Sequence, residues 1–272
     1  MNVKILMCGN SGVFPGMLLA ALSITKHTES RIELFIGTMD LSDINPAFTP
    51  ITEAMRAKLD KVLKRKNPDS YAKIYDFGDS FRRDLIHSKN LGTSYTPYTL
   101  IRLFANEIAE ADDKLLYLDT DVMALGNIDE LYAEDIEKYH IAGVRDFMGK
   151  YFFTPLYLNA GVILFNMKKM RKDRIFEKCV KLCNEKKLFL SDQHALNRYA
   201  SRRLILNHRF NEQRETESNT LIRHFAMRIR LTPKPHKENI KPWHEQLVKE
   251  KLKDRSFDDI YEEYALLQKG EA

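Results

Sequence analysis

Apolar runs alternate with amphipathic segments through the first 120 residues, and this alternation is the strongest constraint on the fold. Strands are predicted where apolar runs of strand length occur, at residues 3–8, 32–37, 72–77 and 114–120. Helices are predicted between them, at residues 15–27, 51–65 and 96–110. Strands separated by helices favour a parallel sheet with helices on both faces. We therefore predict an α/β fold, in which ligands bind beyond the carboxyl ends of the strands.

The second half of the chain is less regular. Strands are predicted at residues 140–146, 160–166, 204–210 and 220–226, and helices at 171–187 and 191–201, the latter with Ser191 as its N-cap. A Pro-rich loop follows at 230–244, and a further helix begins near residue 245. Because there is no internal repeat or clear linker, we predict one domain over residues 1–244 with a C-terminal helical extension at 245–272.

Composition narrows the class of protein. Apolar residues make up 44% of the 272, which is enough for a full core. The chain contains no stretch of 18 uninterrupted apolar residues, so no transmembrane helix is predicted. The first residues lack the pattern of a signal peptide, so we expect a cytoplasmic protein. Three cysteines do not form a disulfide framework. Cys179 and Cys183 are four residues apart, which predicts the buried face of a helix.

The net charge of +5 is concentrated near the C-terminus, where residues 223–255 hold ten Lys or Arg and four Asp or Glu. Such a segment could attract nucleic acid, anionic lipid or a phosphorylated small molecule. Nucleic acid is disfavoured, because no aromatic residues are interleaved to form a stacking platform. For residues 245–255, a peripheral contact with anionic lipid at the inner membrane face and a solvated helical face remain alternatives.

Two carboxylates, Asp119 and Asp121, follow the apolar run Leu115–Leu118 in the sequence LLYLDTD. Residues two apart in an extended chain point to the same side, so the two carboxylates lie side by side at the ligand-binding edge of the sheet. They repel each other unless a cation or a shared proton intervenes. The pair predicts a divalent metal, and the metal predicts an anionic ligand. A lone D-x-D is nevertheless a pattern of low specificity.

Several ordered motifs accompany the D-x-D: Ser23-Ile24, Arg102 in TLIRLF, KLLYLDTDVMALGNIDELY, YLNAGVILFNMKKMR, SDQHALN, RHF, and KPW at 241–243. Together they resemble the retaining glycosyltransferases of family 8, which include glycogenin and bacterial lipopolysaccharide galactosyl- and glucosyltransferases, over residues 3 to 245. The resemblance implies a GT-A-type, Rossmann-like, mostly parallel sheet flanked by helices. It also implies transfer of a hexose from UDP-glucose or UDP-galactose to a glycan, glycolipid or glycoprotein acceptor.

The resemblance implies a metal site of Asp119, Asp121 and His224 that holds Mn²⁺, or Mg²⁺, against the diphosphate of the donor. Oxygen ligands with one imidazole suit Mn²⁺. The family usually has glycine three residues after this histidine, with K-P-W soon afterwards. Here Met227 stands at the glycine position and an insertion precedes Lys241. His236 is therefore the alternative third ligand.

The resemblance also implies two further groups of residues. Donor contacts are expected from Asn10, Ser11, Arg102, Thr120, Asp146, Asn159, Ala160 and Lys241. Asp192 and Gln193 are the expected catalytic residues, although an acid in the first turn of a helix is the alternative interpretation of Asp192. Glutamine is a poor nucleophile, which favours front-side displacement through an oxocarbenium-like ion pair over a covalent glycosyl-enzyme.

The N-terminal loop departs from the family pattern. Family members commonly carry an aspartate and a tyrosine there, which contact ribose and stack on uracil, whereas this chain has Asn10 and Val13. Stacking either moves to Phe14 or is lost. This departure leaves a nucleotide-sugar-binding protein without transfer activity as one alternative function. An aspartyl-phosphate phosphatase is another, but it would have Thr or Val where Met123 stands.

Overall fold

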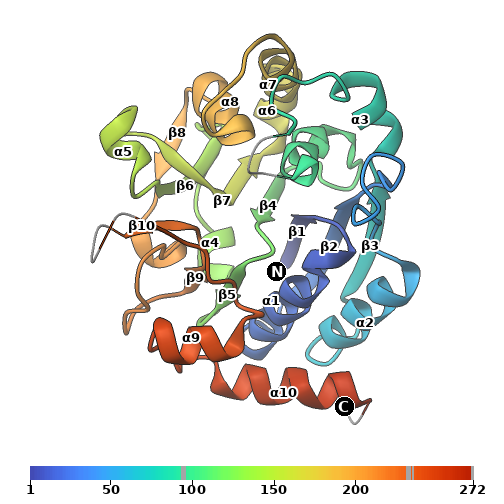
Figure 1. Ribbon diagram of the computed structural model, residues 1–272, viewed down its shortest axis with the longest axis vertical. Coiled ribbons are helices and arrows are strands. Elements are labelled where there is room, and N and C mark those ends of the chain that lie inside the picture. Colours follow the sequence, from blue (N-terminus) through green and yellow to red (C-terminus); the bar gives the residue numbers. More distant parts are fainter. Residues whose placement is uncertain (93–95, 231–233, 235, 271–272) are drawn as a thin grey trace.

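The computed structural model describes residues 1–92, 96–230, 234 and 236–270, so that residues 231–233 and 235 of the predicted Pro-rich loop and 271–272 of the extension lie outside the described residues (Figure 1). A seven-stranded sheet with the order β3-β2-β1-β4-β7-β6-β8 forms its centre. The strands are β1 (Asn2–Cys8), β2 (Arg31–Thr38), β3 (Tyr71–Asp76), β4 (Lys114–Leu118), β6 (Ile141–Arg145), β7 (Leu158–Asn166) and β8 (Arg203–Ile205). Among the strands of this sheet, only β7 pairs antiparallel with its neighbours, β4 and β6. The predicted mostly parallel α/β sheet is confirmed.

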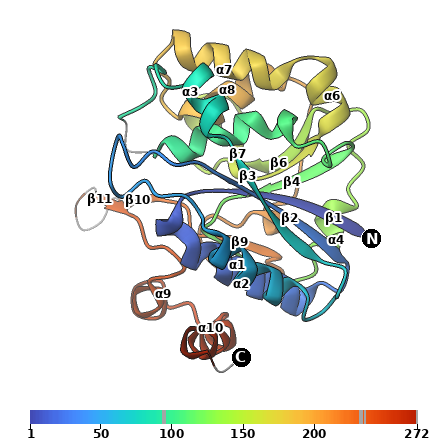
Figure 2. The same cartoon turned by 90° about the vertical axis from the view of Figure 1, so that its right-hand side faces the viewer.

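Helices cover both faces of this sheet, as Figure 2 shows. One face packs against α1 (Phe14–His27) and α2 (Glu53–Leu63), and the other against α3 (Gly78–Asp84), α6 (Met167–Lys172), α7 (Ile175–Glu185) and α8 (Ser191–Tyr199). Successive side chains of β1 point to opposite faces of the sheet. Val3, Ile5 and Met7 therefore pack in the core on the α1 side, whereas Leu6 and Cys8 pack in the core on the other side. Cys179 and Cys183 are buried free thiols on α7, as their spacing predicted.

Three predicted helical features differ from the structure. The segment predicted as a helix over 96–110 is a 3-10 helix, η2 (Pro97–Glu107), because tertiary packing buries side chains on almost every side of it and overrides the amphipathic spacing. The helix predicted over 171–187 is broken at Arg174, whose φ of 51° separates α6 from α7. Ser191 is not an N-cap: it begins α8 with a φ of 43°, and its buried hydroxyl has no hydrogen-bond partner among the described residues.

The C-terminal half contains short elements where longer strands were predicted. The stretch 220–226 forms β9 (Ile222–His224), which pairs antiparallel with β5 (Val122–Ala124). The stretch 204–210 divides into β8 and the 3-10 turn η3 (His208–Phe210). The region predicted as a loop carries a hairpin of β10 (Arg228–Arg230) and β11 (His236–Glu238). Two four-residue helices, α4 (Asp129–Tyr132) and α5 (Gly149–Phe152), complete the connections.

The predicted extension consists of two helices, α9 (Glu245–Lys251) and α10 (Asp258–Lys269), which lie along the α1 side of the sheet in Figures 1 and 2. Val248, Phe257, Ile260 and Tyr261 are buried in the same core cluster as α1. The Tyr261 hydroxyl donates a hydrogen bond of 2.8 Å to the carbonyl of Pro242. The extension is thus packed into the core of the preceding domain.

Much of the basic surplus near the C-terminus is used inside the molecule. Five of the ten basic residues between 223 and 255 are engaged with carbonyls or carboxylates: Arg223, Arg228, Lys241, Lys249 and Arg255. Within residues 245–255, Lys249 and Arg255 pair with carboxylates of the chain itself, which weakens the charge argument for a membrane contact there. Within the described part of the chain, every helix is too short or too polar to cross a bilayer.

Candidate active site

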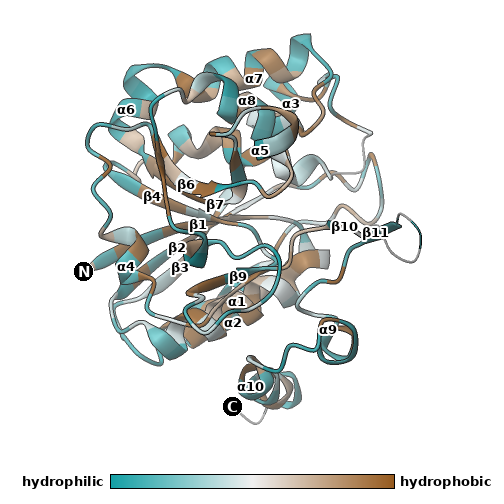
Figure 3. Ribbon diagram, turned by 90° about the vertical axis from the view of Figure 1, so that its left-hand side faces the viewer, coloured by the Kyte–Doolittle hydropathy of each residue, from teal (hydrophilic) through white to brown (hydrophobic). Residues whose placement is uncertain are grey.

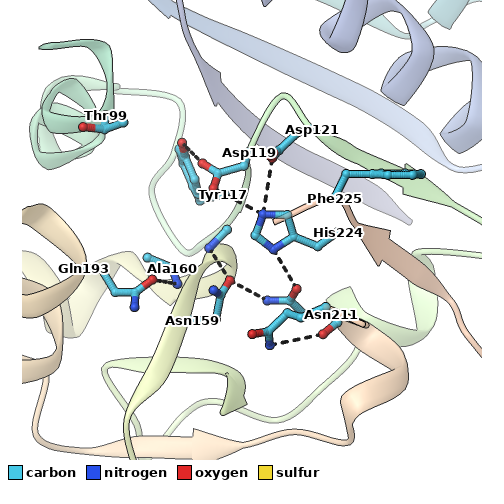
Figure 4. A network of polar contacts seen from close by, with 12 residues as sticks. Thr99, Tyr117, Asp119, Asp121, Asn159, Ala160, Gln193, Asn211, His224 and Phe225 are labelled. Carbon is cyan, nitrogen blue, oxygen red and sulfur yellow. Dashed lines mark hydrogen bonds and ion pairs between the residues drawn. The ribbon is translucent and has the colours of Figure 1, made fainter. Parts of the chain in front are cut away.

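Asp119, Asp121 and His224 converge at the carboxyl end of β4 (Figure 4). The amide of Asp119 donates to the carbonyl of Gly161 on β7, so the first carboxylate stays tied to the sheet. The β5–β9 pairing places His224 opposite Val122, next to Asp121. The Nε2 atom of His224 lies 3.3 Å from Asp121 Oδ1 and 3.7 Å from Asp119 Oδ2. Ligand atoms of all three residues lie within 4.8 Å of one another, a geometry that could hold one divalent cation.

The orientation of the His224 ring is fixed by asparagine side chains. Its Nδ1 lies 3.0 Å from Asn211 Oδ1, and Asn211 Nδ2 donates to Asn159 Oδ1 at 3.0 Å. Because the Asn211 oxygen can only accept, it holds the Nδ1 side of the ring by accepting its N–H, and Nε2 is the ring nitrogen that faces the two carboxylates. His236 lies outside this cluster: it is exposed on β11, and its Nδ1 donates to the carbonyl of Lys234. The structure thus brings His224 to the D-x-D pair, not His236.

Each carboxylate of the D-x-D has a cationic partner. Asp119 Oδ1 accepts hydrogen bonds from Arg102 Nη2 at 3.0 Å and from the Tyr117 hydroxyl at 2.7 Å. Asp121 Oδ2 lies 2.5 Å from Lys241 Nζ. Burial alone would raise the pKa of Asp121, but the charges of Lys241 and His224 outweigh it and hold this pKa well below its usual range. The mutual repulsion predicted from the sequence is therefore compensated within the protein.

Arg102 lies on the 3-10 helix η2, is only 4% exposed and contacts several residues of the site. Besides Asp119, its guanidinium pairs with Asp192 at 3.0 Å, donates to the carbonyl of Ala160 at 2.7 Å and lies over the Tyr117 ring at 4.1 Å. Burial would lower the pKa of Arg102, but the two carboxylates raise it above its ordinary value. Burial raises the pKa of Asp192 to about 6, against the opposing charge of Arg102. These contacts show Arg102 orienting Asp119 and Asp192.

Gln193 is held at both ends of its amide. Its Oε1 accepts from the amide of Ala160 at 2.9 Å, and its Nε2 donates to Asp146 Oδ2 at 3.3 Å. The same Asp146 oxygen accepts from Asn159 Nδ2 at 2.9 Å. A continuous polar network therefore runs from the Asp119–Asp121–His224 cluster to Gln193. It includes both expected catalytic residues and five of the expected donor contacts: Arg102, Asp146, Asn159, Ala160 and Lys241.

The N-terminal loop lies apart from this network. Asn10 Nδ2 donates to the carbonyl of Ala47 at 3.0 Å, and the Ser11 amide donates to the carbonyl of Thr49 at 3.0 Å. Both side chains remain partly exposed, whereas Phe14 is 7% exposed and packs in the core. Phe14 therefore does not offer a free ring face for stacking on a base.

Gly16 explains how the D-x-D loop is packed. A Cβ at this position would lie 2.2 Å from the carbonyl oxygen of Thr120 and 2.6 Å from the Trp243 ring. Only glycine allows this approach of α1 to both segments. Trp243 thus packs its loop against the core, and Thr120 is held between the two aspartates, half-buried.

Three residues of the site were not predicted from the sequence: Gly161, Asn211 and Tyr117. A Cβ at Gly161 would lie 2.2 Å from His224 Cε1 and 2.8 Å from Asp119 Oδ2, so the glycine makes room for the cluster. In the sequence, only its position two residues after Asn159 indicated that Gly161 could lie near the site. Nothing in the sequence around Asn211 distinguishes it from an ordinary loop asparagine.

Known proteins resemble this chain in sequence. The model of the Glycosyl transferase family 8 matches residues 4–246. Glycosyltransferase GlyA of Streptococcus pneumoniae is 38% identical over 106 residues, which are 38% of this chain and 15% of GlyA. GlyF of the same organism is 29% identical over 119 residues, 43% of this chain and 29% of GlyF. The matched region thus spans less than a third of either relative.

Solved structures share the fold across nearly the whole chain. The galactosyltransferase LgtC, in complex with donor and acceptor sugar analogues, superposes with a TM-score of 0.67 at 20% identity, covering 97% of this chain and 95% of LgtC. GlyE of Streptococcus pneumoniae superposes with a TM-score of 0.64 at 19% identity, covering 96% of this chain and 63% of GlyE. At these identities the likeness establishes the GT-A architecture alone. With the family match over residues 4–246, it leads to one conclusion: the chain belongs to glycosyl transferase family 8.

Proposed function

We propose that this protein is a metal-dependent, retaining glycosyltransferase that moves glucose or galactose from a UDP-sugar to a glycan, glycolipid or glycoprotein acceptor. The observation that carries the proposal is the single network that joins the Asp119–Asp121–His224 cluster to Gln193. A nucleotide diphosphate and a sugar need adjacent sites, and this network contains ligands suited to each. Family 8 membership is inconsistent with the aspartyl-phosphate phosphatase interpretation.

The donor atoms present fit Mn²⁺ or Mg²⁺. Two carboxylates and an imidazole nitrogen face one another, and Gly161 leaves the space that a Cβ would fill. When bound, the cation would neutralise the charge that develops on the departing diphosphate. Lys241 supports the same interpretation, because its ammonium lies at the edge of the cluster, where it can turn from Asp121 to a phosphate oxygen.

The residues around Gln193 favour front-side displacement. The glutamine amide is fixed by Ala160 and Asp146, so its oxygen presents a stationary dipole beside the proposed sugar site. Asp192 is paired with Arg102 and is 5% exposed, which disfavours it as a nucleophile. In this scheme the bond from C1 to the UDP oxygen breaks, and its electrons leave with UDP. The acceptor oxygen bonds to C1 from the same face, and its proton passes to the departing diphosphate.

Turnover of UDP-glucose and UDP-galactose tests the proposal. The full chain with Mn²⁺ should release UDP slowly in water and give the α-hexose first, which NMR distinguishes from the β-anomer. Chelation of the metal should abolish the release. If the protein binds UDP-hexose tightly but releases no UDP over many hours, it is a nucleotide-sugar-binding protein instead.

A further inference from the structure

Three aromatic side chains are the most exposed large apolar groups among the described residues. Tyr151 and Phe152, on α5, are 73% and 72% exposed, and Phe189, just before α8, is 80% exposed. We call these three residues the aromatic platform. Large exposed apolar groups that gather in one region of a protein commonly mark a binding surface. α5 lies beside α8 in both Figure 1 and Figure 3.

Neighbouring side chains contact two members of the platform, Phe189 and Tyr151. Phe153 lies 6.0 Å from Phe189, stacks on Tyr157 with centroids 4.6 Å apart, and meets the His194 ring edge-on at 5.3 Å. The Lys150 ammonium lies 5.1 Å from the Tyr151 ring. These contacts link the end of α5 to α8 and limit the directions in which the rings of Tyr151 and Phe189 can turn.

The platform is continuous with the candidate active site. The amides of Met148 and Gly149 donate to Asp146 Oδ1 at 3.1 and 2.6 Å, while Asp146 Oδ2 accepts from Gln193 and Asn159. One carboxylate therefore anchors α5 on one side and the Gln193 amide on the other. A Cβ at Gly149 would lie 2.4 Å from the Tyr157 ring and 3.0 Å from Asp146 Oδ1, so the glycine lets α5 sit directly on this carboxylate.

Flat rings beside a sugar-transfer site match the chemistry of a saccharide. A pyranose has an apolar face of C–H groups that can cover an aromatic ring, while its hydroxyl edge stays hydrated or reaches polar groups such as Lys150. We propose that the aromatic platform binds the acceptor, and that the acceptor presents a glycan of at least two sugar units, one at Gln193 and one stacked on Tyr151 and Phe152. This inference rests on the proposed glycosyltransferase function.

The test uses the full chain with Mn²⁺ and UDP on an array of neutral di- to hexasaccharides. The wild type should bind a subset of these saccharides. The double variant Tyr151→Ala, Phe152→Ala should bind the same subset at least about tenfold more weakly, the loss expected from removing two ring contacts. Tyr151→Phe with Phe152→Trp keeps two rings and should retain binding. Leu266→Ala, at a 44% exposed position on α10, is the control and should behave as the wild type.

Hydrolysis of UDP-hexose without acceptor separates this inference from the proposed function. All four proteins should release UDP at the wild-type rate, because the substituted side chains do not touch the metal cluster or Gln193. Saccharide binding unchanged in the double alanine variant would overturn the platform while hydrolysis continues. A wild type that hydrolyses UDP-hexose but binds no saccharide would also overturn it. Binding to phosphatidylcholine vesicles is measured in parallel, and a double variant that loses vesicle binding but keeps saccharide binding would show that the rings contact lipid instead. Absence of hydrolysis in every protein would instead count against the proposed function.

Discussion

Gly161 is the single residue on which the geometry of the candidate metal cluster most directly depends. Its missing side chain leaves room for the His224 ring and the Asp119 carboxylate, both of which approach the position of an added Cβ to within 2.8 Å or less. Glycine is required here by close approach rather than by a left-handed backbone. A methyl group at this position would displace the metal ligands without changing the chemistry of any of them. A substitution here therefore tests the arrangement of the ligands separately from their identity.

Gly161→Ala should disrupt metal binding with only a moderate loss of stability. Overpacking at a buried position typically costs about 1–3 kcal/mol. The displaced imidazole can no longer share one cation with Asp119, so UDP affinity should become independent of Mn²⁺. Calorimetric titration of UDP with and without Mn²⁺ measures this, and thermal unfolding measures the stability.

Gly126→Ala is the matched control for this substitution. Its nearest neighbour would be the Leu221 side chain at 3.3 Å, which can yield without moving a ligand. It should keep the Mn²⁺ dependence of UDP binding. If Gly161→Ala also keeps that dependence, the arrangement of His224 and Asp119 described here is not the metal site.

The sequence identified the charged members of the site better than the groups that orient them. Asp119, Asp121 and Lys241 stand in motifs with ordered spacing, whereas Asn211 acts through a contact with His224 that only the folded chain creates. The choice between His224 and His236 depended on strand pairing. The sequence could not settle it, because β5 and β9 are only three residues long and too short to carry a clear pattern.

At the scale of elements, the predicted C-terminal extension is helical, and the structure shows what its apolar residues pack against. A solvated helical face was one alternative for residues 245–255, but Val248 in that stretch is buried, and with Phe257, Ile260 and Tyr261 it completes the core beneath α1. Ion pairs join Asp259 to Lys26 and Glu263 to Arg65. A helical pattern shows which face is apolar without showing what covers it, and here the cover lies more than 200 residues earlier in the chain.

Ile260→Ala tests whether the extension is part of the domain. The side chain is 2% exposed, so its truncation should cost about 2–5 kcal/mol and lower the melting temperature of the whole domain in one cooperative transition. Leu266→Ala on the same helix is exposed and should change stability by less than about 0.5 kcal/mol. A separate, early transition for the extension, with the main transition unmoved, would show that residues 245–272 form an independent unit.

At the scale of the whole molecule, the site joins segments that are distant in the sequence. Asp119 and Asp121 follow a central strand, His224 lies on β9, and Lys241 stands just before the C-terminal helices. The pairing of Lys241 with Asp121 already ties the C-terminal segment to the sheet without a ligand. Mn²⁺ and UDP should therefore stabilise the entire fold rather than a local loop, by about 2.7 kcal/mol at a hundredfold excess over Kd.

Asp121→Asn should separate the two contributions of this carboxylate. Because the folded protein lowers the pKa of Asp121 through Lys241 and His224, the ionised group stabilises the fold at neutral pH. Without ligand, the free energy of unfolding of the variant should be lower than that of the wild type by about 1 kcal/mol or more, because Lys241 loses its charged partner. The variant should therefore melt at a lower temperature. It should also lose most of the melting-temperature rise that Mn²⁺ and UDP produce in the wild type, as should the wild type in the presence of a chelator.

Asp113→Asn, which changes an exposed carboxylate paired with Lys168, should keep both the wild-type melting temperature and the full ligand response. Thermal scans of the three proteins with and without Mn²⁺-UDP measure these effects, and an Asp121→Asn variant with an undiminished ligand shift would remove Asp121 from the proposed metal site.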